Sequence, residues 1–119
     1  MSRMASSGAA GASRSQAIAE LNDRLRKTGK GGTIVITENL RRVTGFDAAI
    51  LLSALANYEG FDEDNDPYGE RDFGDLSLWG YDVVFKIDYY DKNLEYGSDN
   101  PADPAVTHRV LTVMLAGDW

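Results

Sequence analysis

An acidic run of five residues that begins at Asp62, DEDND, contains the side chains that bind calcium in loop sites. Asp62, Asp64 and Asp66 alternate like the first three ligands of an EF-hand loop, in which hard oxygen donors converge on the ion. Counting from Asp62, the glycine needed at position six is Pro67, and the bidentate glutamate needed at position twelve is Phe73. The run therefore predicts an acidic loop that binds protein. A nonstandard calcium or magnesium site is the alternative, with the candidate ligands Asp62, Asp64, Asp66 and Glu70.

Two further sets of side chains could support hydrolytic chemistry. Lys86 and Asp88 share one face of a predicted strand, with Glu70 and Asp72 near in the sequence, as in a metal-dependent nuclease. A nuclease has to approach phosphates, however, and the surrounding acids repel them, so a structural cross-strand ion pair is the favoured interpretation. His108 is the only histidine, and we find no partner that would orient it for acid–base catalysis. The sequence thus predicts a protein without enzymatic activity.

Aromatic residues gather around a predicted hairpin that turns near Gly80. Trp79, Tyr89 and Tyr90 lie on or beside it, and their charged neighbours are mainly acids, not the Arg and Lys residues of base-stacking surfaces. Core packing accounts for Tyr89, whereas Tyr90 shares a strand face with Asp88 and is expected to anchor an interface. The predicted interaction surface consists of Asp62, Glu63, Asp64, Asp66, Tyr68, Glu70, Asp72, Asp88, Tyr90 and Asp91.

The N-terminal half is predicted to contain two helices and a strand. A capping box at Ser13 begins a first helix, which ends near Thr28 at a glycine-rich segment. The β-branched run at residues 33–37 predicts a buried strand. A second helix is expected over residues 45–58, with Thr44 as its cap and most of its surface buried.

The C-terminal half is predicted to contain a loop, a hairpin and a third helix. Residues 59–75 include eight acids and are mostly loop. Residues 76–79 and 81–90 are expected to pair across a tight glycine turn, and a short edge strand at residues 94–96 follows. An Asp-Pro pair is typical of a helix start and predicts a third helix over residues 103–116. In the second hairpin strand, alternation turns one set of side chains toward the core: Val83, Phe85, Ile87 and Tyr89.

Length and composition indicate a single α+β domain. The 119 residues have room for one core, and a hydrophobic content of 43% is sufficient to pack it. We expect a disordered tail over residues 1–15 and a globular domain over residues 16–119. The elements follow in the order α-β-α-β-β-(β)-α, with a small antiparallel or mixed sheet of about three or four strands packed against helices.

The chain carries no sign of secretion or membrane insertion. It has no cysteine, so disulfides and thiolate metal sites are excluded and an oxidising compartment is not indicated. Residues 1–15 lack the apolar stretch of a signal peptide, and no apolar run approaches the roughly 20 residues of a membrane span. A cytoplasmic location is expected, with Met4 as an alternative start to Met1.

The net charge of −7 is unevenly distributed. Positions 1–58 contain 4 acids and 8 basic residues, and positions 59–119 contain 15 acids and 4 basic residues. The two parts therefore carry +4 and −11. The acidic part is expected to repel nucleic acid and to attract cations or basic protein surfaces, in a manner that depends on ionic strength.

Several ordered blocks resemble the signature of a small bacterial family of domains of unknown function. The blocks are FDEDNDPYGE at residues 61–70, DFG at 72–74, KIDYYD at 86–91 and NPADP at 100–104. The resemblance covers about residues 16–116. It implies carriage by plasmids, prophages and genomic islands, often beside antirestriction genes, and it implies no particular activity.

In that setting, the expected function is inhibition of host defence, of the anti-CRISPR or antirestriction type. Carboxylates on the loop and hairpin could imitate backbone phosphates and occupy the basic groove of a nucleic-acid-binding protein or complex. The expected partner is thus a basic protein surface, without direct binding of nucleic acid or membrane, and homo-oligomerisation is left open. Two alternatives are a divalent-metal domain that uses residues 62–70 structurally or catalytically, and a regulatory partner of a plasmid or phage protein.

Overall fold

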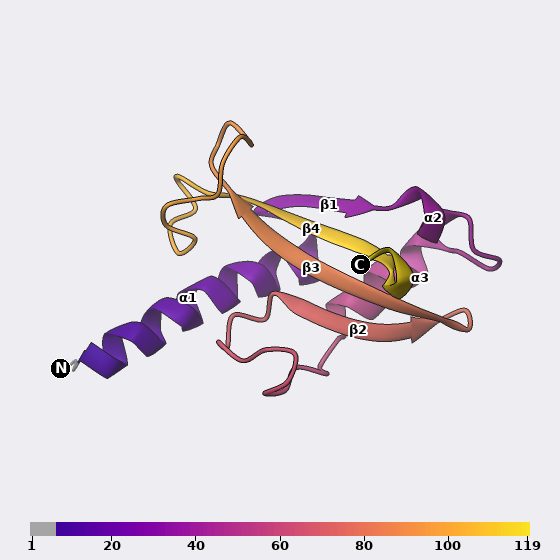
Figure 1. Cartoon of the computed structure of the whole chain (residues 1–119), viewed down its shortest axis with the longest axis horizontal. Coiled ribbons are helices and arrows are strands. Elements are labelled where there is room, and N and C mark those ends of the chain that lie inside the picture. Colours follow the sequence, from indigo (N-terminus) through magenta and orange to yellow (C-terminus); the bar gives the residue numbers. More distant parts are fainter. Residues whose placement is uncertain (1–6) are drawn as a thin grey trace.

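The computed structural model describes the backbone of residues 7–119 and the side chains of residues 14–119 (Figure 1). It confirms the expected α+β class, with helices packed against one mixed sheet. The elements are α1 (Ser7–Thr28), β1 (Gly32–Ile36), α2 (Glu38–Arg41), α3 (Ala48–Ala56), β2 (Phe73–Leu78), β3 (Tyr81–Tyr90), β4 (His108–Leu115) and the 3-10 turn η1 (Ala116–Asp118). Helix α1 begins at Ser7, earlier than the Ser13 start expected from the capping box, and residues 1–6 of the predicted tail lie outside the described residues.

The four strands are arranged in the order β1-β4-β3-β2. Strands β2 and β3 form an antiparallel hairpin, and β3 pairs antiparallel with β4 from Val83 to Tyr90. Strand β1 pairs parallel with β4, with Gly32 opposite Arg109 and Ile36 opposite Val113. The last strand along the chain therefore occupies the interior of the sheet, and β1 and β2 form its two edges.

Helices α1 and α3 cover one face of the sheet (Figure 1). Leu25 of α1 and Leu51 and Leu55 of α3 are fully buried against Phe85 and Val113. The expected inward set of β3 is confirmed, since Val83, Phe85 and Ile87 are buried and Tyr89 packs beside them. The other sheet face carries the alternating residues of each strand and has no helix over it in the described part of the chain (Figure 1).

The predicted turn at Gly80 is confirmed. Trp79 and Gly80 connect β2 to β3, and both have positive φ, at 56° and 81°. Two consecutive positive φ values characterise the type I′ turn, whose twist matches that of the flanking strands. Trp79 bears the strain of this conformation while its ring packs on Phe46, with the ring centroids 5.4 Å apart.

The prediction of a third helix over residues 103–116 was wrong, because residues 108–115 form β4. Asp103 does cap a turn, since its carboxylate accepts from the N–H of Ala105 at 2.9 Å, but the chain then extends. Buried side chains alternate along this segment, as they do in a strand: Arg109, Leu111 and Val113 point into the core. The apolar residues also recur at helical spacing, so the two periods compete, and the β-branched composition favours the strand.

Two other boundaries differ from the sequence prediction. The second long helix begins at Ala48, because the side chain of Asp47 rather than Thr44 caps it by accepting from two backbone N–H groups. Less of the helix surface is buried than expected, since Ile50 and Leu52 are 49% and 43% exposed. The expected edge strand at residues 94–96 is a turn, with a single bridge between Tyr90 and Gly97. None of the described helices is long and apolar enough to cross a membrane.

Close packing at Gly74 gives a test of this arrangement. A Cβ atom at Gly74 would lie 2.5 Å from the ring of Phe85 and 2.7 Å from that of Tyr58. We therefore expect Gly74→Ala to lower the free energy of unfolding, measured by urea denaturation, by about 1–3 kcal/mol, the usual cost of overpacking. Gly117→Ala is the control, because its Cβ would meet nothing within 4 Å. Equal stability of the two variants would contradict the packing described.

Candidate functional site

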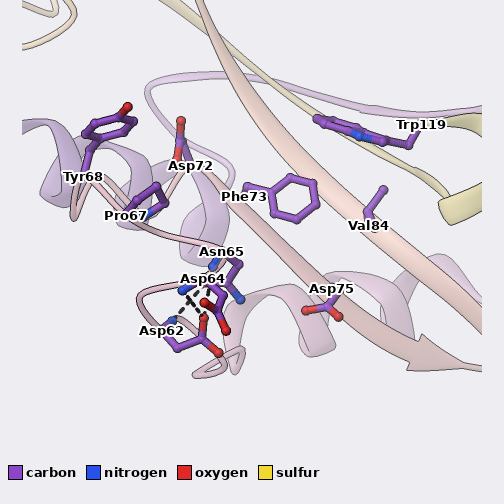
Figure 2. Close-up of a pocket in the computed structure, with 10 residues that line it drawn as sticks. All are labelled: Asp62, Asp64, Asn65, Pro67, Tyr68, Asp72, Phe73, Asp75, Val84 and Trp119. Carbon is purple, nitrogen blue, oxygen red and sulfur yellow. Dashed lines mark hydrogen bonds between the residues drawn. The ribbon is translucent and has the colours of Figure 1, made fainter.

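The acidic loop between α3 and β2 is held in shape by its own polar side chains (Figure 2). One carboxylate oxygen of Asp62 accepts hydrogen bonds from the N–H groups of Asp64 and Asn65, at 2.9 and 3.0 Å. The Asn65 side chain accepts from the N–H of Asp62 and donates to the carbonyl of Gly60, each at 2.9 Å. Asp and Asn side chains commonly close turns in this way. The acidic run therefore stabilises the fold of its own loop.

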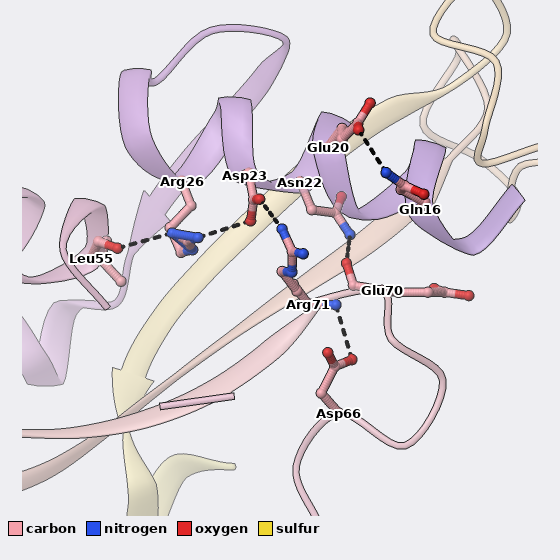
Figure 3. Close-up of polar contacts among 9 residues, drawn as sticks. All are labelled: Gln16, Glu20, Asn22, Asp23, Arg26, Leu55, Asp66, Glu70 and Arg71. Carbon is pink, nitrogen blue, oxygen red and sulfur yellow. Dashed lines mark hydrogen bonds and ion pairs between the residues drawn. The ribbon is translucent and has the colours of Figure 1, made fainter. Parts of the chain in front are cut away.

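A chain of charged residues fastens the end of this loop to α1 (Figure 3). Arg71 donates its backbone N–H to the carboxylate of Asp66 at 2.9 Å, and its guanidinium pairs with Asp23. Asp23 also pairs with Arg26 at 2.8 Å, and Arg26 donates to the carbonyl of Leu55 at 3.3 Å. Burial lowers the pKa of Arg26, and the Asp23 carboxylate opposes that shift. Helix α1 thus holds both the loop and α3 in place.

A second polar network is buried between α1 and the sheet. Fully buried Asn22 donates to the hydroxyl of Tyr89 at 2.8 Å and to the carbonyl of Glu70 at 3.0 Å. It accepts from Nε of Arg109 at 2.8 Å, while the Tyr89 hydroxyl donates to the Glu70 carboxylate at 2.9 Å. Burial raises the pKa of Tyr89 and lowers that of Arg109. Arg109 also donates to the carbonyl of Pro101, so the network ties the loop to both β3 and β4.

An open groove of about 600 Å³ lies between the loop and the sheet face that α1 and α3 leave uncovered (Figure 2). Its floor is apolar: Phe73, Val84 and Trp119 lie together, with the rings of Phe73 and Trp119 5.0 Å apart. Trp119 is 68% exposed, and Tyr68 on the loop side is 78% exposed. The rim carboxylates of the groove are Asp62, Asp64, Asp72 and Asp75, and Asn65 and Pro67 complete the lining.

The rim carboxylates are not paired with a basic side chain in the described part of the chain, since Lys86, which lies opposite Phe73 in the hairpin, pairs with Asp88 instead. No basic residue lines the groove, and the ion pairs found among the described residues include none of the four carboxylates. Burial raises the pKa of Asp72, and the nearby charges of Glu70, Asp66 and Asp88 add to the rise. A cation that entered the groove would remove this repulsion.

A second hollow of about 530 Å³ continues the groove along β2. It shares Asp75 and Val84 with the groove and adds Ser77, Asp82 and Ala116. Because Asp75 lies opposite Val84, and Ser77 opposite Asp82, these residues belong to the same uncovered sheet face. The acidic character therefore extends beyond the loop along the edge of the sheet.

The chain matches one family of known sequences. A family model described as "Protein of unknown function (DUF3768)" matches residues 36–118. The chain belongs to this family. The DUF3768 segment contains the loop, the hairpin and the whole groove except Trp119, and it begins well after residue 16, where the resemblance was expected to start. No curated protein and no solved structure matches the chain.

Within the DUF3768 segment, the predicted interaction residues are divided between several places. Those that line the groove are Asp62, Asp64, Tyr68 and Asp72, and Glu63 is exposed nearby on the loop. Asp66 and Glu70 instead accept hydrogen bonds from the backbone N–H of Arg71 and the hydroxyl of Tyr89, which hold the loop in place.

The remaining predicted residues lie at the opposite end of the hairpin from its turn. Asp88 pairs with Lys86 at 2.6 Å. The ion pair joins two residues of the same strand, so the prediction of a cross-strand pair was wrong. Asp91 accepts from the N–H groups of Asn93 and Glu95 and closes a turn beside Tyr90. The structure therefore does not bring all ten predicted residues together into one surface.

Six residues that line the groove are absent from the predicted interaction surface: Asn65, Pro67, Phe73, Asp75, Val84 and Trp119. Phe73, Asp75 and Val84 belong to strands whose other face fills the core, and alternation along β2 and β3 could have placed them together. Trp119 follows η1, and its position depends on β4, which the sequence analysis predicted as a helix. No sequence feature near Trp119 indicated its contact with Phe73.

The metal candidates do not gather into a metal-binding group in the described part of the chain. No group of three or more His, Cys, Asp or Glu side chains in that part lies close enough to hold a metal ion. Nε2 of His108 lies 2.8 Å from the hydroxyl of Thr33 and so links β4 to β1. Asp62, Asp66, Glu70 and His108 instead form hydrogen bonds within the fold.

The buried network can be tested through Asn22. Asn22→Ala would leave the Arg109 Nε–H without its partner and remove both bonds that the amide donates. We expect the free energy of unfolding in urea to fall by about 1–3 kcal/mol, the usual cost of an unsatisfied buried polar group. Gln16→Ala, on an exposed part of the same helix, is the control and should change stability little. A small effect at both positions would show that the network does not hold the loop to α1.

The raised pKa of Asp72 gives a test by pH. Its ionised form is disfavoured in the folded state, so ionisation costs stability above the raised pKa, and this cost disappears as the pH falls through that pKa. Asp72→Asn should therefore be more stable than the unmodified protein at pH 7, by up to about 1 kcal/mol. The difference should shrink in acid when thermal unfolding is followed across pH. Glu63→Gln is the control. An equal gain in stability for that variant would contradict the burial of Asp72 as the cause.

Proposed function

We propose that this chain is a non-catalytic protein-binding domain that binds a basic surface of its partner with the acid-rimmed groove. The composition of the groove carries the proposal: an apolar floor lies beneath four carboxylates, and no basic residue lines it. Interfaces of this kind gain affinity from aromatic contacts at the centre, and selectivity and encounter rate from charge at the rim. The largely exposed side chains of Trp119 and Tyr68 supply the aromatic contacts.

The charge of the surrounding chain supports the same partner chemistry. Positions 59–119, which contain the groove, carry −11, whereas positions 1–58 carry +4. A field of this sign attracts basic protein surfaces over roughly a Debye length, about 8–10 Å at physiological salt. It disfavours direct contact with phosphate backbones for the same reason.

We infer that the partner is a nucleic-acid-binding component of a bacterial defence system, which this chain inhibits in the anti-CRISPR or antirestriction manner. Such components present basic grooves to phosphates, and carboxylates can occupy the same positions as phosphate oxygens. The acidic groove supplies the complementary charge. The resemblance of residues 61–70 and 86–91 to proteins of mobile elements is the reason for choosing this partner class.

The proposal is tested by a tagged pull-down from a bacterial host that carries defence systems, washed across a salt series and identified by mass spectrometry. We expect recovery of a nucleic-acid-binding protein at low salt and its loss as salt rises. The rim variant Asp64→Asn/Asp72→Asn/Asp75→Asn should lower the affinity for the recovered protein about tenfold, at roughly 0.5 kcal/mol for each lost charge.

The matched control variant is Glu20→Gln/Glu95→Gln/Asp99→Asn, which removes three exposed charges away from the groove. It should bind the partner as the unmodified protein does. Failure to recover any nucleic-acid-binding protein at low salt, or equal losses in the two triple variants, would overturn the proposal. A melting temperature raised several degrees by calcium or magnesium, and reversed by EDTA, would favour the metal-binding alternative.

A further inference from the structure

The groove combines two features that rarely occur together on a protein surface. Its floor exposes a large aromatic ring, since Trp119 is 68% exposed while it packs on Phe73. Its rim is negative, and the carboxylates of Asp72 and Asp75 lie on either side of Phe73 in the sequence and both line the hollow. An exposed aromatic ring favours contact with an apolar or cationic group, and the rim excludes anions.

The site is an open hollow. A projecting side chain of the partner can therefore lie on its floor. Val84 at its base is only 7% exposed, so a group that reaches the floor meets a close-packed apolar surface. The occupant therefore needs an apolar stem long enough to cover this floor and a positive head that reaches the rim.

Arginine meets these requirements better than lysine does. Its guanidinium is planar, stacks on indole rings, and can pair with a carboxylate through two parallel hydrogen bonds. The ammonium of lysine is compact and strongly hydrated, and it gains less from a flat aromatic surface. The protein already uses the same kind of contact in its interior, where the guanidinium of Arg109 lies 5.1 Å from the ring centroid of Tyr89.

We propose that the groove binds an arginine side chain from an exposed segment of the partner, stacked on Trp119 and paired with Asp72 and Asp75. This proposal rests on the protein-binding function above and specifies what that function recognises. The arginine stem covers Phe73 and Val84, and its positive charge is complementary to the rim carboxylates that line the groove. Arginine-rich segments are common on proteins that bind nucleic acid, which connects this specificity to the inferred partner class.

The experiment is a titration of the full chain, labelled with nitrogen-15, with three peptides followed by NMR. The probes are acetyl-Gly-Ala-Arg-Ala-Gly-amide and the same peptide with lysine or with citrulline, the uncharged analogue of arginine. We expect the arginine peptide to shift the indole N–H signal of Trp119 and to bind at least about threefold more tightly than the lysine peptide. The citrulline peptide should bind at least about tenfold more weakly than the arginine peptide.

Variants assign the effect to the groove. Trp119→Ala should weaken the arginine peptide about three- to fivefold, the size of one cation–π contact. Tyr96→Ala, another exposed aromatic residue outside the groove at 73% exposure, is the matched control and should leave the affinity unchanged. Dispersed amide signals in both variants would show that each remains folded.

Equal binding of the arginine and lysine peptides, with no effect of Trp119→Ala, would overturn the arginine proposal. So would the absence of any peptide binding. In either case the protein-binding function would stand if the triple rim variant still lost the partner in the pull-down. If the arginine and lysine peptides bound equally, and the triple rim variant and its control bound the recovered partner equally, both proposals would be overturned.

Discussion

The hydrogen bonds of Asn22 join parts of the chain that lie far apart in the sequence. Through Arg109, Tyr89 and Glu70 they connect α1 to β4, to β3 and to the end of the acidic loop. A buried guanidinium is costly unless its donors are satisfied, so Arg109 constrains the side chains around it to one arrangement. The loop that forms one side of the groove is positioned by this requirement.

Acidic residues have two distinct uses in this fold. Asp23, Asp66 and Glu70 face inward, where arginine side chains, backbone amides and a tyrosine hydroxyl neutralise or satisfy them. Asp64, Asp72 and Asp75 line the groove without a basic partner among the described residues. The sequence shows only that the loop is acidic. Which carboxylates are free to meet a partner depends on the three-dimensional contacts of each one.

The hairpin was the most predictable part of the structure. Alternation in β3 and the glycine at its turn identified the strands, the turn and the inward face, because these features depend on neighbouring residues. Strand β4 was not predicted, since Val106, Val110, Val113 and Met114 also fit a helical period and an Asp-Pro pair precedes them. Its identity as a strand is fixed by pairing with β1 and β3, which a local pattern does not contain.

The groove was predictable only in part for the same reason. Asp62, Asp64, Tyr68 and Asp72 stand out in the sequence because they lie in one acidic stretch. Val84 and Trp119 come from other elements and reach the groove only when β4 and η1 are in place. The loop's attachment to α1 through Asp23 and Arg71 likewise spans 48 residues and has no local pattern.

The placement of β4 also affects how the chain folds during synthesis. Strand β1 emerges from the ribosome before β4, its strand partner in the described part of the chain, which is made about 75 residues later. Until then one edge of β3 and both edges of β1 are unpaired, and such edges can associate with other chains. Closure of the sheet therefore requires β4, and pairing across so many residues of sequence is intrinsically slow to form.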